Sequence, residues 1–114
     1  MSRTIKVVVR EPGKKAEVRE IENTLEAFQA IVGGYIEATT SPELFAKERV
    51  FAYVNENGRE KRLPPNMWVH NGSTLLRGTI VLSKCDTEGE DIGIPDSDAK
   101  RMATALDVIP HVPH

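Results

Sequence analysis

The pattern of apolar and polar positions predicts that the chain opens with a β-hairpin. Residues 4–9 are apolar and β-branched at most positions, which is typical of a buried strand. The turn Glu11-Pro12-Gly13-Lys14 follows, in which proline presets φ and glycine supplies a positive φ. Apolar and charged side chains then alternate over residues 16–21, so this segment is expected to form a half-exposed strand that pairs with the first.

A helix and a third strand follow the hairpin. Four apolar residues recur at helical spacing: Leu25, Phe28, Ile31 and Val32. Asn23 is expected to be the N-cap, because its side-chain oxygen can accept hydrogen bonds from the free amides of the first turn. Gly33 and Gly34 are expected to end the helix, since one of them can adopt the left-handed conformation without strain. Residues 35–39 then resume as a strand.

The middle of the chain is rich in strands and turns. Residues 50–55 predict a strand, and the turn Asn55-Glu56-Asn57-Gly58 follows it. Residues 59–63 are expected to pair back on that strand. The two prolines of Leu63-Pro64-Pro65-Asn66 exclude a central strand or a helix interior. Residues 67–76 are expected to be irregular.

The order of these elements predicts the fold class. Residues 40–43 open either a loop or a short helix, residues 78–83 predict the last strand, and residues 98–107 predict a closing helix capped by Asp96 or Ser97. Because helices do not alternate with strands, an α+β fold is favoured over a doubly wound α/β fold. We expect a β-hairpin–helix–strand opening, a mixed or antiparallel sheet with one main helix packed on it, and a C-terminal helix.

Composition and charge are those of an ordinary globular domain. The 114 residues are 39% hydrophobic and 28% charged, with a formal net charge of −2, which gives no global attraction to nucleic acid or to an anionic membrane. We expect one domain over residues 1–109 and a C-terminal tail over residues 110–114. No signal peptide is recognised, and no apolar run approaches the roughly 18 residues of a membrane span. Cys85 is the single cysteine, which excludes an internal disulfide and suits a reducing cytoplasm.

The usual signatures of catalysis are missing from the sequence. The three histidines, His70, His111 and His114, lack the spacing of a metal site, and Cys85 lacks a nucleophile signature. The glycine pair ends a helix instead of beginning one, which is the reverse of a phosphate-binding loop. We therefore expect no enzyme, no catalytic residue, no metal and no cofactor.

Basic and aromatic residues form the remaining candidate site. Arginines and lysine between positions 49 and 62 surround an aromatic strand and its turn, and Trp68 and Arg77 come soon after. Guanidinium groups pair with phosphates and aromatic faces stack on bases, so a pocket built from them suits a nucleotide-like anion. The candidate ligand-binding residues are Arg62, Arg77, Tyr53, Trp68 and Asn66. The alternative interpretation is an exposed cationic hairpin beside aromatic residues of the core.

Several ordered motifs of this chain resemble those of a known family. They are the segment Glu20–Glu37, Asn55-Glu-Asn-Gly58, Leu63-Pro-Pro-Asn66 and Leu76-Arg-Gly-Thr-Ile-Val81. Together they resemble a family of small phage and mobile-element proteins that is catalogued as a domain of unknown function. The resemblance covers about residues 4–100. That family usually carries an arginine directly after the Leu-Pro-Pro-Asn motif, where this chain has Met67-Trp68.

The resemblance implies a biological context and a kind of activity. It implies a phage or mobile-element protein in the cytoplasm of a bacterial host. Small phage proteins of similar size include the sponges of the Thoeris and related defence systems, which bind cyclic signalling nucleotides without cleaving them, usually between subunits. By this resemblance the chain is a homo-oligomer that sequesters a small nucleotide. A protein that sequesters a nucleotide must bind it tightly. Tight binding needs arginine side chains that contact the phosphates and aromatic rings that stack on the bases.

Two other classes of function stay open on the sequence. The chain could be a protein–protein module that inhibits or assists a host protein through a strand edge or the acidic segment 86–98. It could also be a small hydrolase acting on a nucleotide, although no acid–base pair or metal set is recognised.

Overall fold

An antiparallel sheet of five strands forms the centre of the protein. The computed structural model describes residues 3–40, 49–69, 72–86, 88 and 90–113. The strand order is β2-β1-β7-β4-β3, and every neighbouring pair is antiparallel. The strands are β1 (Thr4–Arg10), β2 (Glu17–Glu22), β3 (Ile36–Thr40), β4 (Val50–Asn55) and β7 (Ile80–Lys84).

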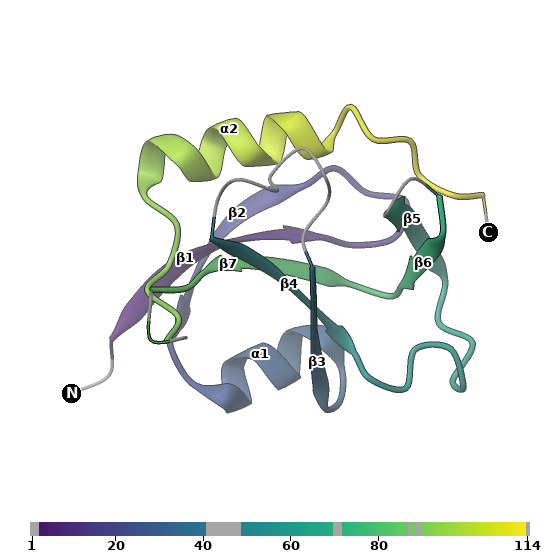
Figure 1. Ribbon diagram of the computed structural model, residues 1–114, viewed down its shortest axis with the longest axis horizontal. Helices are drawn as coiled ribbons and strands as arrows, with labels where there is room; N and C mark the ends of the chain where they lie inside the picture. Colours follow the sequence, from purple (N-terminus) through teal and green to yellow (C-terminus); the bar gives the residue numbers. More distant parts are fainter. Residues whose placement is uncertain (1–2, 41–48, 70–71, 87, 89, 114) are drawn as a thin grey trace.

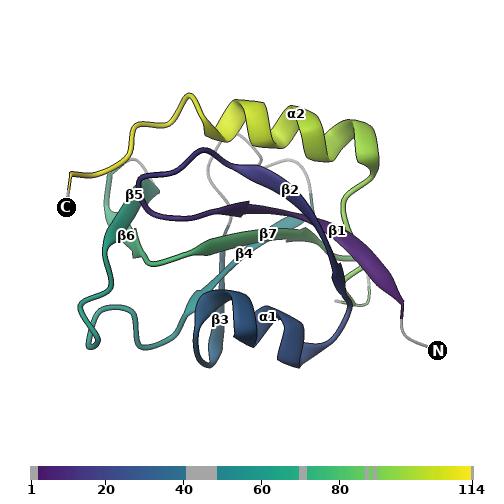
Figure 2. The ribbon, with the colours of Figure 1, turned by 180° about the vertical axis from the view of Figure 1, so that it is seen from behind.

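Two helices and a separate hairpin complete the fold. Helix α1 (Leu25–Val32) covers one face of the sheet, and helix α2 (Asp96–Leu106) covers the other (Figure 1). The hairpin of β5 (Pro65–Val69) and β6 (Thr74–Arg77) forms a second, two-stranded sheet. Seen from behind, the same three layers appear, with the hairpin at the end of the sheet that faces the C-terminus (Figure 2). The predicted α+β class, hairpin–helix–strand opening and C-terminal helix are confirmed.

The strand β1 is apolar from Val7 to Val9 because both of its faces are covered there. Val7 and Val9 belong to the core under α1 together with Phe28, whereas Val8 belongs to the core under α2 together with Met102. Strands buried on both faces have continuous apolar runs instead of alternation. The buried strand predicted at residues 4–9 is therefore confirmed.

The N-terminal cap of α1 differs from the predicted one, whereas its C-terminal end is as predicted. The N-cap is Thr24, whose hydroxyl accepts a hydrogen bond from the amide of Ala27 at 3.1 Å. The predicted cap Asn23 is wrong, because its side-chain amide donates to the backbone carbonyl of Asp91 at 2.8 Å instead. The helix ends as predicted at Gly33, which has a left-handed φ of 80°.

Two segments differ from the predicted strand pattern. Residues 59–62 form turns, and residues 59–63 do not pair back on β4; the amide of Leu63, for example, donates to the carbonyl of Gly58. Their charged run offers no apolar side to pack on the sheet. Residues 67–76, expected to be irregular, contain most of the β5–β6 hairpin. Proline can begin β5 because this sheet has only two strands and the pairing shifts between Pro65 and Met67.

The C-terminal helix begins earlier than expected. Helix α2 begins at Asp96 instead of Asp98, with Pro95 at the cap position and no side-chain cap hydrogen bond. Asp96 is bound by Lys6 of β1, with 2.8 Å between ammonium nitrogen and carboxylate oxygen. An acidic residue in the first turn also interacts favourably with the helix dipole. The loop or short helix expected from residue 40 onwards lies, from residue 41, outside the described residues.

The C-terminal tail runs along the hairpin and the first turn. The amide of Val112 donates to the carbonyl of Asn66 at 3.0 Å, and the amide of Gly13 donates to Nδ1 of His111 at 3.1 Å. Residues 110–113 have no regular secondary structure but are held by these two contacts. In the part of the chain that the structure describes, neither helix has the length and apolar character needed to cross a membrane.

Candidate ligand-binding groove

A candidate site is formed by a groove between the sheet and the β5–β6 hairpin. It has a volume of about 570 Å³ and opens on the same face of the sheet as α2. Its floor comes from β3 and β4, one wall from the hairpin and one end from the turn after β4. The lining residues that carry polar or aromatic groups are Glu37, Thr39, Asn55, Glu56, Arg59, Trp68, Ser73, Thr74 and Arg77.

One end of the groove is fixed by Asn55, the last residue of β4. Its buried side-chain amide donates to the carbonyl of Val32 at the end of α1, and its Oδ1 accepts from the amide of Asn57. A Cβ at Gly34 would lie 2.8 Å from the Asn55 amide nitrogen, so the side chain needs a glycine there. The Gly-Gly and Asn-Glu-Asn-Gly motifs therefore meet in space and join α1 to the turn that lines the groove.

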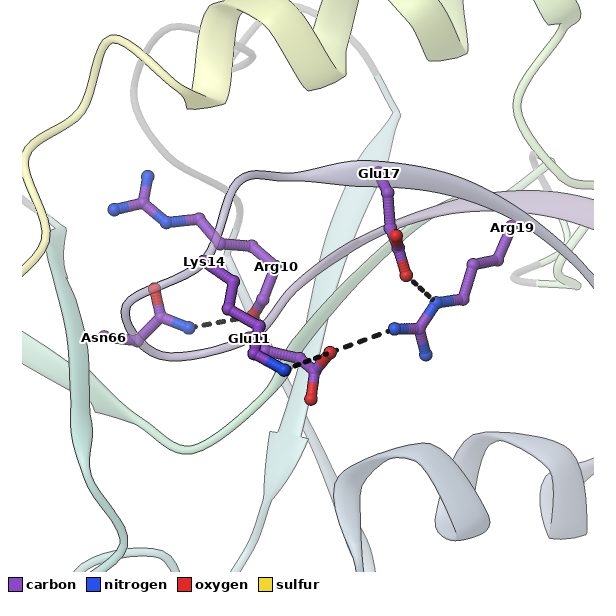
Figure 3. Close-up of polar contacts among 6 residues, drawn as sticks. All are labelled: Arg10, Glu11, Lys14, Glu17, Arg19 and Asn66. Atoms are coloured by element: carbon purple, nitrogen blue, oxygen red, sulfur yellow. Dashed lines mark hydrogen bonds and ion pairs between the residues drawn. The ribbon is translucent and has the colours of Figure 1, made fainter.

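The hairpin that forms the groove wall is anchored by Asn66, the second residue of β5. Its buried amide donates to the carbonyl of Arg10 at 2.8 Å (Figure 3). It also donates to the carbonyl of Gly78 at 2.9 Å. The amide of Gly78 in turn donates to the carbonyl of Pro64 at 2.7 Å. The Leu-Pro-Pro-Asn and Leu-Arg-Gly-Thr motifs thus hold the hairpin against the end of β1.

Trp68 and Arg77 come together in the wall of the groove. Trp68 lies opposite Leu75 in the hairpin register, and Arg77 is two residues further along β6, so all three side chains share one face. Diagonal neighbours of this kind lie about 7–8 Å apart. The Trp68 side chain is 49% exposed. Nη1 of Arg77 donates to the carbonyl of Leu63 at 3.1 Å, which anchors one corner of a guanidinium that has five N–H donors.

The groove carries both signs of charge. Arg59 and Arg77 supply two cations, and Glu37 and Glu56 supply two carboxylates. Hydroxyls of Thr39, Ser73 and Thr74 lie among them. This arrangement suits a ligand that has an anionic part and hydrogen-bond donors, beside a flat part for the exposed indole.

Tyr53, another predicted ligand residue, lies on the opposite face of the sheet. Its ring centroid is 5.0 Å from that of Phe28 in α1, and its hydroxyl donates to Oδ1 of Asp91 at 2.9 Å. Cys85 also donates to this carboxylate oxygen, at 3.4 Å. Burial, reinforced by the bond to Asp91, raises the pKa of Tyr53 well above its usual value. Burial likewise raises the pKa of the Cys85 thiol, which disfavours the reactive thiolate.

The two remaining predicted residues also lie apart from the groove lining. Arg62 is exposed in the turns before the hairpin and has a positive φ of 54°. Asn66 is fully buried, and its amide is engaged by the two backbone carbonyls described above. The structure therefore unites Trp68 and Arg77 and separates them from Tyr53, Arg62 and Asn66.

Apart from Trp68 and Arg77, the polar residues of the groove lining were not selected from the sequence; Glu37, Thr39, Glu56 and Arg59 are among those missed. Glu37 and Thr39 alternate along β3, and the β3–β4 register places them beside Val54 and Ala52 on the groove face. That register depends on which strands become neighbours, which no local pattern reveals. Arg59 belongs to the basic run already noted in the sequence, but only the turn decides which of its members face the groove.

Arg10 forms a second polar centre, away from the groove. It is fully buried, and its Nη1 donates to the carbonyl of Leu106 at 2.6 Å, at the end of α2. Burial lowers the pKa of this guanidinium, and the charge of Asp107 opposes that effect. A cation at a helix C-terminus interacts favourably with the helix dipole, so Arg10 ties α2 to β1.

No metal centre is found among the residues that the structure describes, since no group of three or more His, Cys, Asp or Glu side chains comes together. The fold and the groove define a small α+β protein with an open polar cleft beside an isolated hairpin. The chain belongs to the family described as Domain of unknown function (DUF3846), whose model matches residues 5–107. No curated protein and no solved structure matches the chain.

Proposed function

We propose that this protein binds a small nucleotide in the groove beside the β5–β6 hairpin and does not cleave it. The observation that carries the proposal is the half-exposed indole of Trp68 on the same hairpin face as the guanidinium of Arg77. An indole exposed in a cleft is available for stacking on a base. Arg77, with Arg59 of the same groove lining, would meet the phosphates, because a guanidinium matches phosphate geometry with paired hydrogen bonds.

The resemblance described above extends this proposal to a biological role. The ligand would be a cyclic nucleotide signal of a bacterial defence system, and the protein would be a homo-oligomeric sponge of a phage or mobile element in the host cytoplasm. The hydroxyls of Thr39, Ser73 and Thr74 support a ligand with several acceptor oxygens. An open groove in one copy would bury only part of such a ligand, which favours a site shared between copies.

Native mass spectrometry of the purified protein tests the proposal directly. The protein is measured alone and with a mixture of cyclic nucleotides and cyclic ADP-ribose isomers. We expect a discrete ligand mass on the protein, released unchanged after denaturation. A ligand recovered with an altered mass would support the hydrolase alternative, and no bound mass with any of these compounds would contradict the proposal.

Three arginine substitutions locate the site. Arg77→Ala is expected to weaken binding about 10- to 100-fold, the effect of losing one charge-assisted contact. Arg49→Ala is the matched control, because Arg49 is exposed and lies outside the groove lining. Arg62→Ala tests a residue that was selected from the sequence but lies outside the groove. If this variant binds the nucleotide with unchanged affinity, the phosphate is bound by the groove arginines. Thermal unfolding of each variant shows whether the fold is intact.

A second candidate is a protein–protein module that acts on a host protein. The specific observation in its favour is the outer edge of β3, which pairs with no other strand among the described residues. A host protein that co-purifies in a fixed ratio with protein that binds no nucleotide would favour this candidate.

A further inference from the structure

The two edge strands of the five-stranded sheet differ in how many charged side chains they carry. Strand β2, at one edge, has four charged residues among six: Glu17, Arg19, Glu20 and Glu22. Strand β3, at the other edge, has the single charge of Glu37 among five residues. Charged side chains on an edge strand prevent pairing with another chain. By this measure β2 is protected against pairing with another chain, whereas β3 is an unguarded edge, one that charge does not protect.

Exposed aromatic side chains lie beside the unguarded edge. Tyr35 directly precedes β3 and is 67% exposed. Phe51 lies opposite Thr40 in the register of β4 with β3 and is 40% exposed. The two rings lie near opposite ends of β3, because Tyr35 precedes Ile36 and Phe51 is paired with Thr40. A chain that paired along the whole of β3 would run past both positions.

We propose that β3 pairs with β3 of a second copy of this chain, antiparallel about a two-fold axis through Ala38. The two sheets then become one continuous sheet. A register centred on Ala38 places Glu37 opposite Thr39 of the second copy, and Ile36 opposite Thr40. All five residues of the strand are paired, and no like charges face each other. A register centred on Glu37 would place two carboxylates opposite each other, which is unfavourable.

The same symmetry brings the two grooves together. A two-fold axis perpendicular to the sheet leaves the α2 faces of both copies on one side. Glu37 and Thr39 both line the groove on that face. Since paired strands lie about 4.8 Å apart, the two grooves would meet across the axis and form one cleft. The pairing stands independently of the proposed function; only the role of the joined cleft rests on it.

The oligomeric state without ligand tests the pairing. Sedimentation velocity over a dilution series is expected to show a reversible dimer for the unmodified protein. Ala38→Lys places two ammonium groups directly opposite each other at the axis, so its dimer dissociation constant should rise about tenfold or more. Ala30→Lys is the matched control, because Ala30 is also an exposed alanine but lies in α1, and it should dimerise as the unmodified protein does.

A cross-linking variant keeps the test decisive if Ala38→Lys disturbs the fold. Ala38→Cys brings two thiols together at the axis and should form an intermolecular disulfide under mild oxidation, whereas Ala30→Cys should not. A monomer throughout the dilution series would overturn the inference. A dimer that Ala38→Lys leaves intact, or equal cross-linking of the two cysteine variants, would also overturn it. Nucleotide binding measured separately on the same samples keeps this result distinct from that of the proposed function.

Discussion

The side-chain amide of Asn66 donates to the backbone carbonyl of Arg10 at 2.8 Å, although 56 positions separate the two residues in sequence. This bond holds the β5–β6 hairpin against the end of β1 (Figure 3). The Arg10 side chain continues the same connection to the carbonyl of Leu106, at the end of α2. The position of Trp68 and Arg77, and thus the shape of the groove, depends on this connection.

Removal of the Asn66 amide is expected to destabilise the whole protein. Asn66→Ala leaves two buried carbonyls, those of Arg10 and Gly78, without their donor, so the free energy of unfolding should fall by about 2–4 kcal/mol. Urea unfolding measures the change. Asn57→Ala is the control, since the Asn57 side chain makes no hydrogen bond to the described residues and its loss should cost less than about 0.5 kcal/mol. Equal effects of the two substitutions would contradict this role of Asn66.

Gly93 is expected to tolerate no side chain. Its φ is +78°, and a Cβ would lie 2.8 Å from Cβ of Ile5 and 3.2 Å from the amide nitrogen of Lys6. Gly93→Ala therefore adds a clash with β1 to the strain of the left-handed backbone, and should lower the free energy of unfolding by more than about 2 kcal/mol. Gly13→Ala isolates the backbone strain, because Gly13 has a φ of +75° and nothing within 4 Å of the new Cβ. Calorimetry should show a smaller loss for Gly13→Ala, and the reverse order would contradict the contact with Ile5.

Tyr53 is expected to stay protonated as long as the protein is folded. Its pKa is raised by burial and by the bond to Asp91, so above about pH 10 the unfolded chain loses a proton that the folded protein keeps. Stability should therefore fall as the pH rises through that range. In Tyr35→Phe protein the ultraviolet absorbance of tyrosinate reports Tyr53 alone, because the chain has two tyrosines. Circular dichroism shows whether the protein is still folded at each pH. Ionisation of Tyr53 near pH 10 while the protein is folded would contradict the burial of its hydroxyl.

His111 is expected to hold the C-terminal tail without contributing much to overall stability. His111→Ala removes the acceptor of the Gly13 amide, so hydrogen exchange at Gly13 and Val112 should accelerate. The free energy of unfolding should change by less than about 0.5 kcal/mol, because the hydrogen bond that is removed lies at the surface. The amide of Val8 in the central sheet serves as the internal reference. Unchanged exchange at Gly13 would show that the tail is held by other contacts.

Local patterns were sufficient where the structure depends on neighbours in the sequence. The apolar run of β1, the stripe of α1 and the left-handed Gly33 were predictable, because burial on two faces, helical spacing and a tight helix end each leave a local mark. Boundaries were less predictable. Asn23 and Thr24 are both good caps, and the contact of Asn23 with Asp91, distant in sequence, decided between them.

The sequence alone determined the fold class, the helices, most of the main strands and the pairing of Trp68 with Arg77 as candidates for one site. Only the tertiary structure decided that β3 is an edge strand, that residues 67–76 contain a hairpin, and that Tyr53 lies on the face opposite the groove. The physical reason is that strand order and register arise from contacts between distant segments. The bonds of Asn55 and Asn66 to remote carbonyls are examples of such contacts, and a side chain's own neighbours in the sequence do not reveal them.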